Sequence, residues 1–197
     1  MKYGHFDEQN KEYVITRPDT PAPWANYLGS PEYGAIISNN AGGYSFVKSG
    51  AHGRIIRYIF NNFDQPGRYI YLRDDETSDF WSASWQPVGK DLDTYKSECH
   101  HGTAYTNITA DYAGIKSEAL YYVPLNKTHE VWKLKVTNTS DKTRKISDEM
   151  DKLINDFFFF LFIWQIVIFV GLILLLKKFA WKPILDAVNE REEGIKN

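Results

Sequence analysis

The sequence has a single cysteine, Cys99, so it lacks the second thiol that an intramolecular disulfide needs. Nothing in it therefore calls for an oxidising compartment. The charges nearly cancel, at 23 basic against 25 acidic residues, which excludes the strong positive field typical of nucleic-acid binding. The N-terminal stretch has no apolar run of the kind found in secretory signals, and we expect it not to direct export.

Motifs that define common catalytic folds are also missing. The sequence contains no glycine-rich phosphate loop and no Gly-X-Ser-X-Gly turn. One short run, Cys99-His100-His101, suggests a metal. Adjacent residues on a strand point to opposite faces, however, so these side chains are poorly placed to share an ion. We expect structural histidines, with no metal and no cofactor.

Short apolar and aromatic runs, separated by turns rich in Gly, Asn and Pro, fill residues 1–147. Alternation is regular near the end, where Trp132, Leu134 and Val136 point to one face of a strand. Strands at this spacing, without a helical stripe between them, predict an all-β antiparallel sandwich. The predicted strands are Tyr33–Ser38, Tyr44–Val47, Arg54–Phe60, Arg68–Leu72, Phe80–Trp85, Ala104–Thr109, Ile115–Val123 and Glu130–Thr137.

An acidic cluster lies next to two tryptophans in the middle of this region. Carboxylates beside aromatic rings are typical of sugar binding and of glycosidic acid–base chemistry. A solvated acidic turn before a buried aromatic strand gives the same pattern, and we favour that structural interpretation. We therefore assign no catalytic residue to the cluster, which comprises Asp74, Asp75, Glu76 and Asp79 beside Trp81 and Trp85.

Residues 157–176 form a run of 20 residues without a charge, of which 17 are Leu, Ile, Val or Phe. At about 1.5 Å per residue a helix of this length reaches about 30 Å, the hydrocarbon thickness of a bilayer. Its apolar residues contribute about −5 to −10 kcal/mol to insertion. We predict a single transmembrane α-helix here.

Residues 177–197 begin with lysines and are rich in charge. Pro183 suits the first turn of a new helix, because its missing N–H needs no partner there. We expect a short charged helix that leaves the membrane toward a helical partner. A simple stop-transfer tail is the alternative.

Residues 18–61, beginning PDTPAPWANYLGS, and 68–108, beginning RYIYLRDDETSDFW, resemble the amino-terminal part of bacterial cellobiose phosphorylases of glycoside hydrolase family 94. The resemblance covers residues 1–147 and implies an incomplete β super-sandwich domain. Family members convert cellobiose and inorganic phosphate to glucose 1-phosphate and glucose. Their general acid and phosphate-binding residues lie downstream, in an (α/α)6 barrel. No family catalytic residue maps onto this chain, which we expect to be inactive alone.

Residues 150–157, MDKLINDF, and 170–197, beginning VGLILLLKKFAWKPIL, resemble the amino terminus of subunit b of bacterial F-type ATP synthases. Met150 stands where the initiator of that subunit would be. In this family the helix anchors the peripheral stalk in the membrane, and subunit b contributes no catalytic residue. The resemblance implies the lipid bilayer and the ATP synthase membrane subunits as partners of 157–197, and the barrel domain and a homodimer partner for 1–147.

We thus interpret the chain as a fusion of two fragments, joined at 148–156, that arose from a gene-model error or a genomic rearrangement. A phosphorylase piece with activity of its own and a membrane-anchored carbohydrate-binding module are the alternatives. Basic residues near the two membrane edges balance, and residues 1–147 have no signal to cross. We predict a single-pass protein of the bacterial inner membrane whose soluble part is cytoplasmic.

Overall fold

Three antiparallel sheets make up the first part of the chain. The computed structural model describes residues 2–57, 66–148, 165 and 168–169, and the chain divides into two units, Met1–Glu149 and Met150–Asn197. The strands are β1 (Gly4–Asp7), β2 (Glu12–Ile15), β3 (Ala25–Ser30), β4 (Tyr33–Ser38), β5 (Gly43–Val47), β6 (Arg54–Ile56), β7 (Tyr71–Asp74), β8 (Phe80–Ser82), β9 (Lys96–His101), β10 (Tyr105–Tyr112), β11 (Ile115–Tyr122), β12 (Val131–Asn138) and β13 (Ile146–Asp148).

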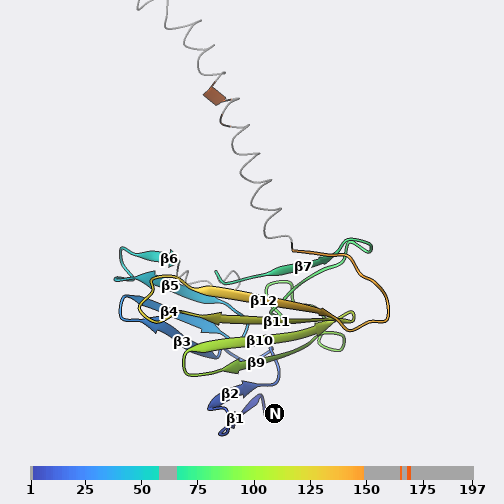
Figure 1. Ribbon diagram of the computed structural model, residues 1–197, viewed down its shortest axis with the longest axis horizontal. Coiled ribbons are helices and arrows are strands. Elements are labelled where there is room, and N and C mark those ends of the chain that lie inside the picture. Colours follow the sequence, from blue (N-terminus) through green and yellow to red (C-terminus); the bar gives the residue numbers. More distant parts are fainter. Residues whose placement is uncertain (1, 58–65, 149–164, 166–167, 170–197) are drawn as a thin grey trace, which may run out of the picture. The chain divides into compact units, whose positions relative to one another are not determined.

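The largest sheet has the strand order β1-β2-β9-β10-β11-β12. In Figure 1, strands β12, β11, β10 and β9 follow one another down the molecule toward the β2–β1 hairpin. The pairing of β10 with β11 runs unbroken from Tyr105–Tyr122 to Tyr112–Ile115. Along β11 every second residue is buried, because one face of the strand meets the core and the other meets solvent.

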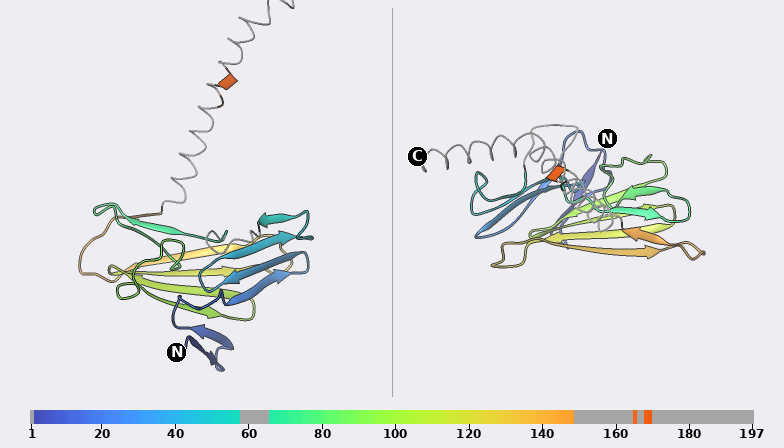
Figure 2. Two further views of the ribbon diagram at one scale, coloured as in Figure 1. Left: turned by 180° about the vertical axis from the view of Figure 1, so that it is seen from behind. Right: turned by 90° about the horizontal axis from the view of Figure 1, so that it is seen from above.

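Two smaller sheets complete this unit, in the orders β3-β4-β5-β6 and β13-β7-β8. Figure 2 shows β3–β6, in blue and cyan, beside β9–β12, in green to orange. The main core joins these two sheets, with Leu28 and Ile37 from one and Ile108 and Tyr121 from the other. A second cluster, which includes Leu72, Trp81, Tyr95 and Ile115, packs β7 and β8 onto the six-stranded sheet. This confirms the all-β antiparallel fold.

The turn between β4 and β5 requires glycine at the position where β5 begins. Gly43 has a φ of 144°, and an added Cβ would lie 2.0 Å from the carbonyl oxygen of Ile36. Only glycine fits this approach without displacing the neighbouring strand. The glycine-rich segment is thus a turn that leads into β5, which begins at Gly43, in agreement with the sequence.

The predicted strands agree with the structure to different degrees. Strand β4, Tyr33–Ser38, has the predicted bounds. The bounds of β10, β11 and β12 lie within a few residues of the predicted ones. The predicted strand Arg68–Leu72 is shifted in the structure, where β7 covers Tyr71–Asp74 and Arg68 lies before it in a buried ion pair. Residues 58–60 of the predicted strand Arg54–Phe60 lie outside the described residues. Strands β1, β2, β3, β9 and β13 had not been predicted.

A buried ion pair links the two larger sheets. The guanidinium of Arg68, 0% exposed, donates through Nε and Nη2 to the two carboxylate oxygens of Glu130, each at 2.5 Å. Arg68 also donates to the carbonyl of Ile36 on β4, at 3.1 Å. Glu130 precedes β12 and accepts a further hydrogen bond, at 2.8 Å, from the hydroxyl of Tyr33. The pair therefore fixes β4 against the end of the six-stranded sheet.

The predicted transmembrane helix, 157–176, and the predicted helix at 177–197 lie almost wholly outside the described residues. Gln165, Ile168 and Phe169 are helical. Within the described part of the chain, no helix has the length and apolar character that crossing a membrane requires. Both helices remain predictions from the sequence.

We predict that Glu130→Ala destabilises the β unit by about 3–5 kcal/mol, because it leaves the guanidinium of Arg68 buried without a counter-charge. Denaturant unfolding of the whole chain in detergent, followed by near-UV circular dichroism, measures this. Glu118→Ala is the matched control, since Glu118 pairs with exposed lysines and should cost at most about 1 kcal/mol. Equal effects from the two substitutions would contradict a structural role for the pair.

Candidate functional site

The acidic cluster is held by contacts within the fold. Asp74 is 1% exposed and accepts hydrogen bonds from the backbone amides of Glu76 and Thr77, at 2.8 and 3.3 Å. The guanidinium of Arg144 donates to the other oxygen, with Nε at 3.1 Å. The amide of Glu76, then Arg144 and the amide of Thr77 hold the pKa of Asp74 below its ordinary value. Its carboxylate closes the turn after β7.

Two other acidic residues of the cluster, Asp75 and Asp79, also have structural partners. Asp79 accepts from Lys90 Nζ at 2.6 Å and from the hydroxyl of Tyr112 at 2.9 Å. The hydrogen bond from Lys90 is the main reason why the pKa of Asp79 lies below its ordinary value. Asp75 accepts a hydrogen bond from Ser147, at 2.7 Å. The cluster is therefore a charged turn tied to distant segments.

The two tryptophans beside the cluster are not presented as a sugar-binding platform. Trp81 is 1% exposed and belongs to the second core cluster. Trp85 packs against the same cluster, and its indole N–H donates to the carbonyl of Lys90 at 2.7 Å. Both rings thus contribute to packing around β8, which agrees with the structural interpretation of this segment.

The histidines of the Cys99-His100-His101 run point to opposite sides of β9. His100 lies between the carboxylates of Glu12 and Glu98, at 2.6 and 2.7 Å. His101 contacts the hydroxyl of Thr106, at 2.9 Å, and the carbonyl of Trp24. Cys99 is buried, and burial raises the pKa of its thiol. Among the residues that the structure describes, no group of His, Cys, Asp and Glu has the arrangement of a metal site.

Glu12 and His100 form a charged link between β2 and β9 that sequence reasoning missed. Burial lowers the pKa of His100, but its bonds to Glu12 and Glu98 outweigh this, and the net shift is upward. Burial raises the pKa of Glu12, but the hydrogen bonds from Tyr105 and His100 bring it below its ordinary value. The two partners are 88 residues apart in the sequence, and no local pattern relates them.

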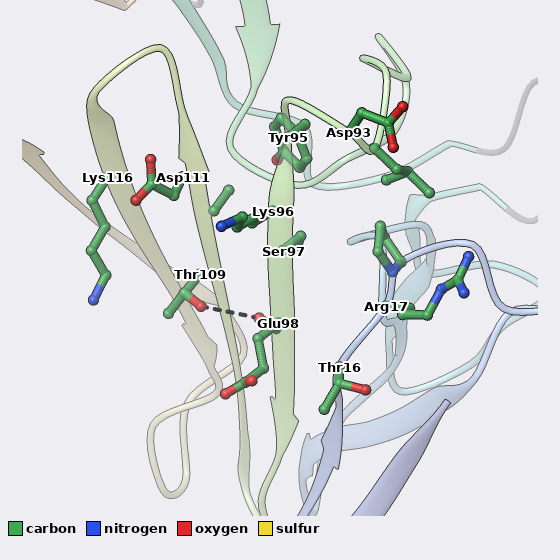
Figure 3. Close-up of a pocket in the computed structure, with 13 residues that line it drawn as sticks. Thr16, Arg17, Asp93, Tyr95, Lys96, Ser97, Glu98, Thr109, Asp111 and Lys116 are labelled. Carbon is green, nitrogen blue, oxygen red and sulfur yellow. Dashed lines mark hydrogen bonds between the residues drawn. The ribbon is translucent and has the colours of Figure 1, made fainter. Parts of the chain in front are cut away.

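An open groove of about 540 Å³ lies on the solvent face of the six-stranded sheet. Figure 3 shows Lys96 and Glu98 on β9, Thr109 and Asp111 on β10, and Lys116 on β11 along it. Three basic and three acidic side chains line the groove, with Arg17 and Asp93 completing the set. Because the charges balance, the lining suits a neutral polar ligand better than an anion.

The strand order, the two cores and the glycine-specific turn define a β-sandwich domain of the supersandwich class. Residues 11–148 match the family described as glycosyl hydrolase 94, supersandwich domain, and the chain belongs to this family. The resemblance to family 94 phosphorylases is confirmed.

Individual relatives extend this finding. The chain is 53% identical over 148 residues to N,N'-diacetylchitobiose phosphorylase of Vibrio furnissii and 35% identical over 152 residues to solabiose phosphorylase of Paenibacillus borealis. These matches cover 75% and 73% of this chain but only 18% and 19% of the relatives. The chain thus spans about a fifth of the length of the phosphorylases it matches. The choice of cellobiose as the substrate stays a prediction.

The C-terminal segment has a different relative. Over 48 residues, 24% of this chain, it is 75% identical to ATP synthase subunit b of Flavobacterium psychrophilum, of which the match covers 29%. The second resemblance is therefore confirmed as a similarity. The chain joins a segment of a family 94 supersandwich domain to a segment similar to ATP synthase subunit b.

We predict that Asp74→Asn lowers the melting temperature of the β unit, because it weakens the bond to Arg144 and the closure of the turn after β7. Glu76→Gln, at an exposed position of the same turn, should leave it unchanged. Thermal unfolding followed by tryptophan fluorescence compares the two. If only Glu76→Gln had an effect, the structural interpretation of the cluster would be wrong.

We also predict a pH-dependent contribution from His100. Its pKa in the folded protein lies above the ordinary value of 6.5, so the stabilisation is fully present below pH 6.5 and is lost as the pH rises through the folded pKa. His100→Gln should therefore cost about 1 kcal/mol at about pH 5.5 and less at about pH 8.5, since solvent partly screens a pair whose side chains are 25% and 11% exposed. Melting curves at both pH values measure this, with the exposed His52→Gln as a control that should show no difference.

Proposed function

We propose that residues 1–147 are the non-catalytic amino-terminal part of a disaccharide phosphorylase and have no phosphorolytic activity of their own. The observation that supports this most directly is the state of the acidic cluster, in which Asp74 and Asp79 are bound to Arg144 and Lys90. Inverting phosphorolysis needs a free acid at the leaving oxygen and a phosphate on the opposite face of the sugar. Carboxylates committed to cations inside the fold do not suit either task.

The names of the relatives support the same proposal. Proteins that share this region are named for N,N'-diacetylchitobiose and for solabiose. One domain shared by enzymes of different substrates is better explained as a scaffold than as the site of substrate choice. We propose a β-linked disaccharide, N,N'-diacetylchitobiose or cellobiose, as the substrate of the complete enzyme, with inorganic phosphate as co-substrate. The catalytic barrel and a homodimer partner are the partners proposed for this region.

For the C-terminal segment we propose a membrane anchor. The charge-free run 157–176 and the similarity to ATP synthase subunit b support it. The proposed partners of 157–197 are the lipid bilayer and the membrane subunits of an ATP synthase. We place the anchor in a bacterial inner membrane and the β unit on its cytoplasmic side. In this proposal the chain is a fusion of two fragments without a complete activity.

The first test is an activity assay. The purified chain, given phosphate with cellobiose or with N,N'-diacetylchitobiose, should release no sugar 1-phosphate above a protein-free blank. The phosphorylase of Vibrio furnissii is the positive control. Sustained release by this chain, lost on Asp79→Asn, would overturn the non-catalytic proposal.

The second test concerns the membrane. In intact spheroplasts, an external protease should leave residues 1–147 uncut, and it should cut them once the membrane is opened. Recovery of the chain in the soluble fraction after lysis would contradict the anchor. Digestion of the β unit in intact spheroplasts would instead place that unit outside.

A carbohydrate-binding module attached to the membrane is the second candidate, and the groove of Figure 3 is the observation that favours it. Its lysines offer donors for a polyol, and its carboxylates and the hydroxyl oxygens of Thr16 and Thr109 offer acceptors. Calorimetric titration of the chain with cellobiose and with N,N'-diacetylchitobiose tests this. Saturable binding that Thr109→Val abolishes would favour the module. The absence of any binding heat would rule this candidate out.

A further inference from the structure

His100 on β9 has a carboxylate at each of its two ring nitrogens. Its Nδ1 lies 2.6 Å from Oε2 of Glu12 on β2, and its Nε2 lies 2.7 Å from Oε1 of Glu98 on β9. An ionised carboxylate only accepts hydrogen bonds, and a neutral imidazole has a single N–H to donate. Both contacts are therefore hydrogen bonds only when the ring carries two protons and a positive charge.

The groups around this ring come from the strands that pack beside it. On β10 the hydroxyl of Tyr105 donates a second hydrogen bond to Glu12. Burial, and to a smaller extent the charge of Asp7 on β1, raise the pKa of Glu12, but the bonds from Tyr105 and the ring bring it below its ordinary value. The positions directly opposite the ring in the two ladders, Val14 and Asn107, are uncharged. Glu12 thus stays ionised beside the ring.

The two carboxylates differ in how well they tolerate the loss of a hydrogen bond. The side chain of Glu12 is 11% exposed, whereas that of Glu98 is 46% exposed and lines the open groove of Figure 3. Among the described residues, the ring of His100 is the one hydrogen-bond partner of the Glu98 side chain. Water replaces a lost bond readily at an exposed carboxylate and poorly at a buried one. A ring with one proton therefore keeps it on the side of Glu12.

We propose that His100 is a protonation switch that controls the carboxylate of Glu98 in the groove. With two protons, the ring joins Glu12 to Glu98. When the ring is deprotonated, the proton on Nε2 leaves for water, the proton on Nδ1 stays on the hydrogen bond to Glu12, and the side chain of Glu98 is released. The groove then gains a free acceptor, while the β1–β2 hairpin keeps its side-chain link to β9. This inference does not depend on any of the functions proposed above.

The same contacts set the pH range of the switch. Burial lowers the pKa of His100, but its bonds to Glu12 and Glu98 outweigh this, so the folded pKa lies above the ordinary value of 6.5. Glu98 is accordingly held by the ring at pH 6.5 and below, and it is released as the pH rises through the folded pKa.

Nitrogen NMR of the whole chain in detergent micelles, with 15N-labelled histidine, tests the proposal. The chain has five histidines, and the signals that are missing from His100→Gln are those of His100. At pH 6.5 more than half of the ring should carry both protons. As the pH rises, Nε2 should shift to the position of an unprotonated nitrogen and Nδ1 should not. A titration midpoint below 6.5, or loss of the proton from Nδ1, would overturn the proposal.

Two matched variants show which carboxylate fixes the remaining proton. Glu98→Ala should lower the midpoint of His100 and leave the proton of the neutral ring on Nδ1. Glu12→Ala should also lower the midpoint, but the proton should move to Nε2, which faces Glu98. The same proton position in both variants would show that Glu12 does not fix it, and the proposal would fail.

The release of Glu98 has a readout of its own. With 13C-labelled glutamate, the side-chain carboxyl signal of Glu98 should shift at the midpoint of the His100 titration, and Glu98→Ala identifies this signal. The shift should be lost in His100→Gln. A Glu98 signal that does not change at that midpoint would contradict the release into the groove.

Discussion

The packing of the β unit depends on one buried ion pair, that of Arg68 with Glu130. A guanidinium with 0% exposure is stable only where its donors are matched, and the carboxylate and two backbone carbonyls supply that match. Burial raises the pKa of Glu130, but the bonds from Arg68 bring it below its ordinary value, so the carboxylate stays ionised. Hydrophobic contacts are not directional and allow the sheets to shift relative to one another. A bidentate ion pair is directional and fits only one relative position of the two sheets.

Other ion pairs follow the same design at smaller scale. Arg144 reaches Asp74 across 70 residues of sequence, and His100 reaches Glu12 across 88. Each pair joins segments that are far apart in the sequence. The acidic residues beside the tryptophans are thus better understood as connectors between segments than as reactive groups. This is also why a pattern that suggests sugar chemistry can belong to a scaffold.

The sequence was informative where alternation is strong. β4, β10 and β11 were predictable because buried residues recur at every second position, and β12 because Trp132 and Leu134 alternate with exposed lysines. β9, with the sequence KSECHH, was not predictable, because its alternate positions Ser97, Cys99 and His101 do not form an apolar pattern; His101 instead bonds to Thr106 inside the fold. The partner of Asp74, Arg144, could not be named from the sequence, since long-range pairing leaves no local signal. The apolar run 157–176 remains a prediction from hydropathy.

β13 has a mechanical consequence. The family match ends at residue 148, and β13, Ile146–Asp148, pairs with β7 over three residues up to that point. A chain held beyond this position transmits any tension directly into that short ladder, where few hydrogen bonds share the load. The clasp of Arg144 on Asp74 lies just upstream, at the turn that follows β7. Stretching the chain would therefore detach β13 from β7 first. The next contact to resist the force would be the ion pair of Arg144 with Asp74.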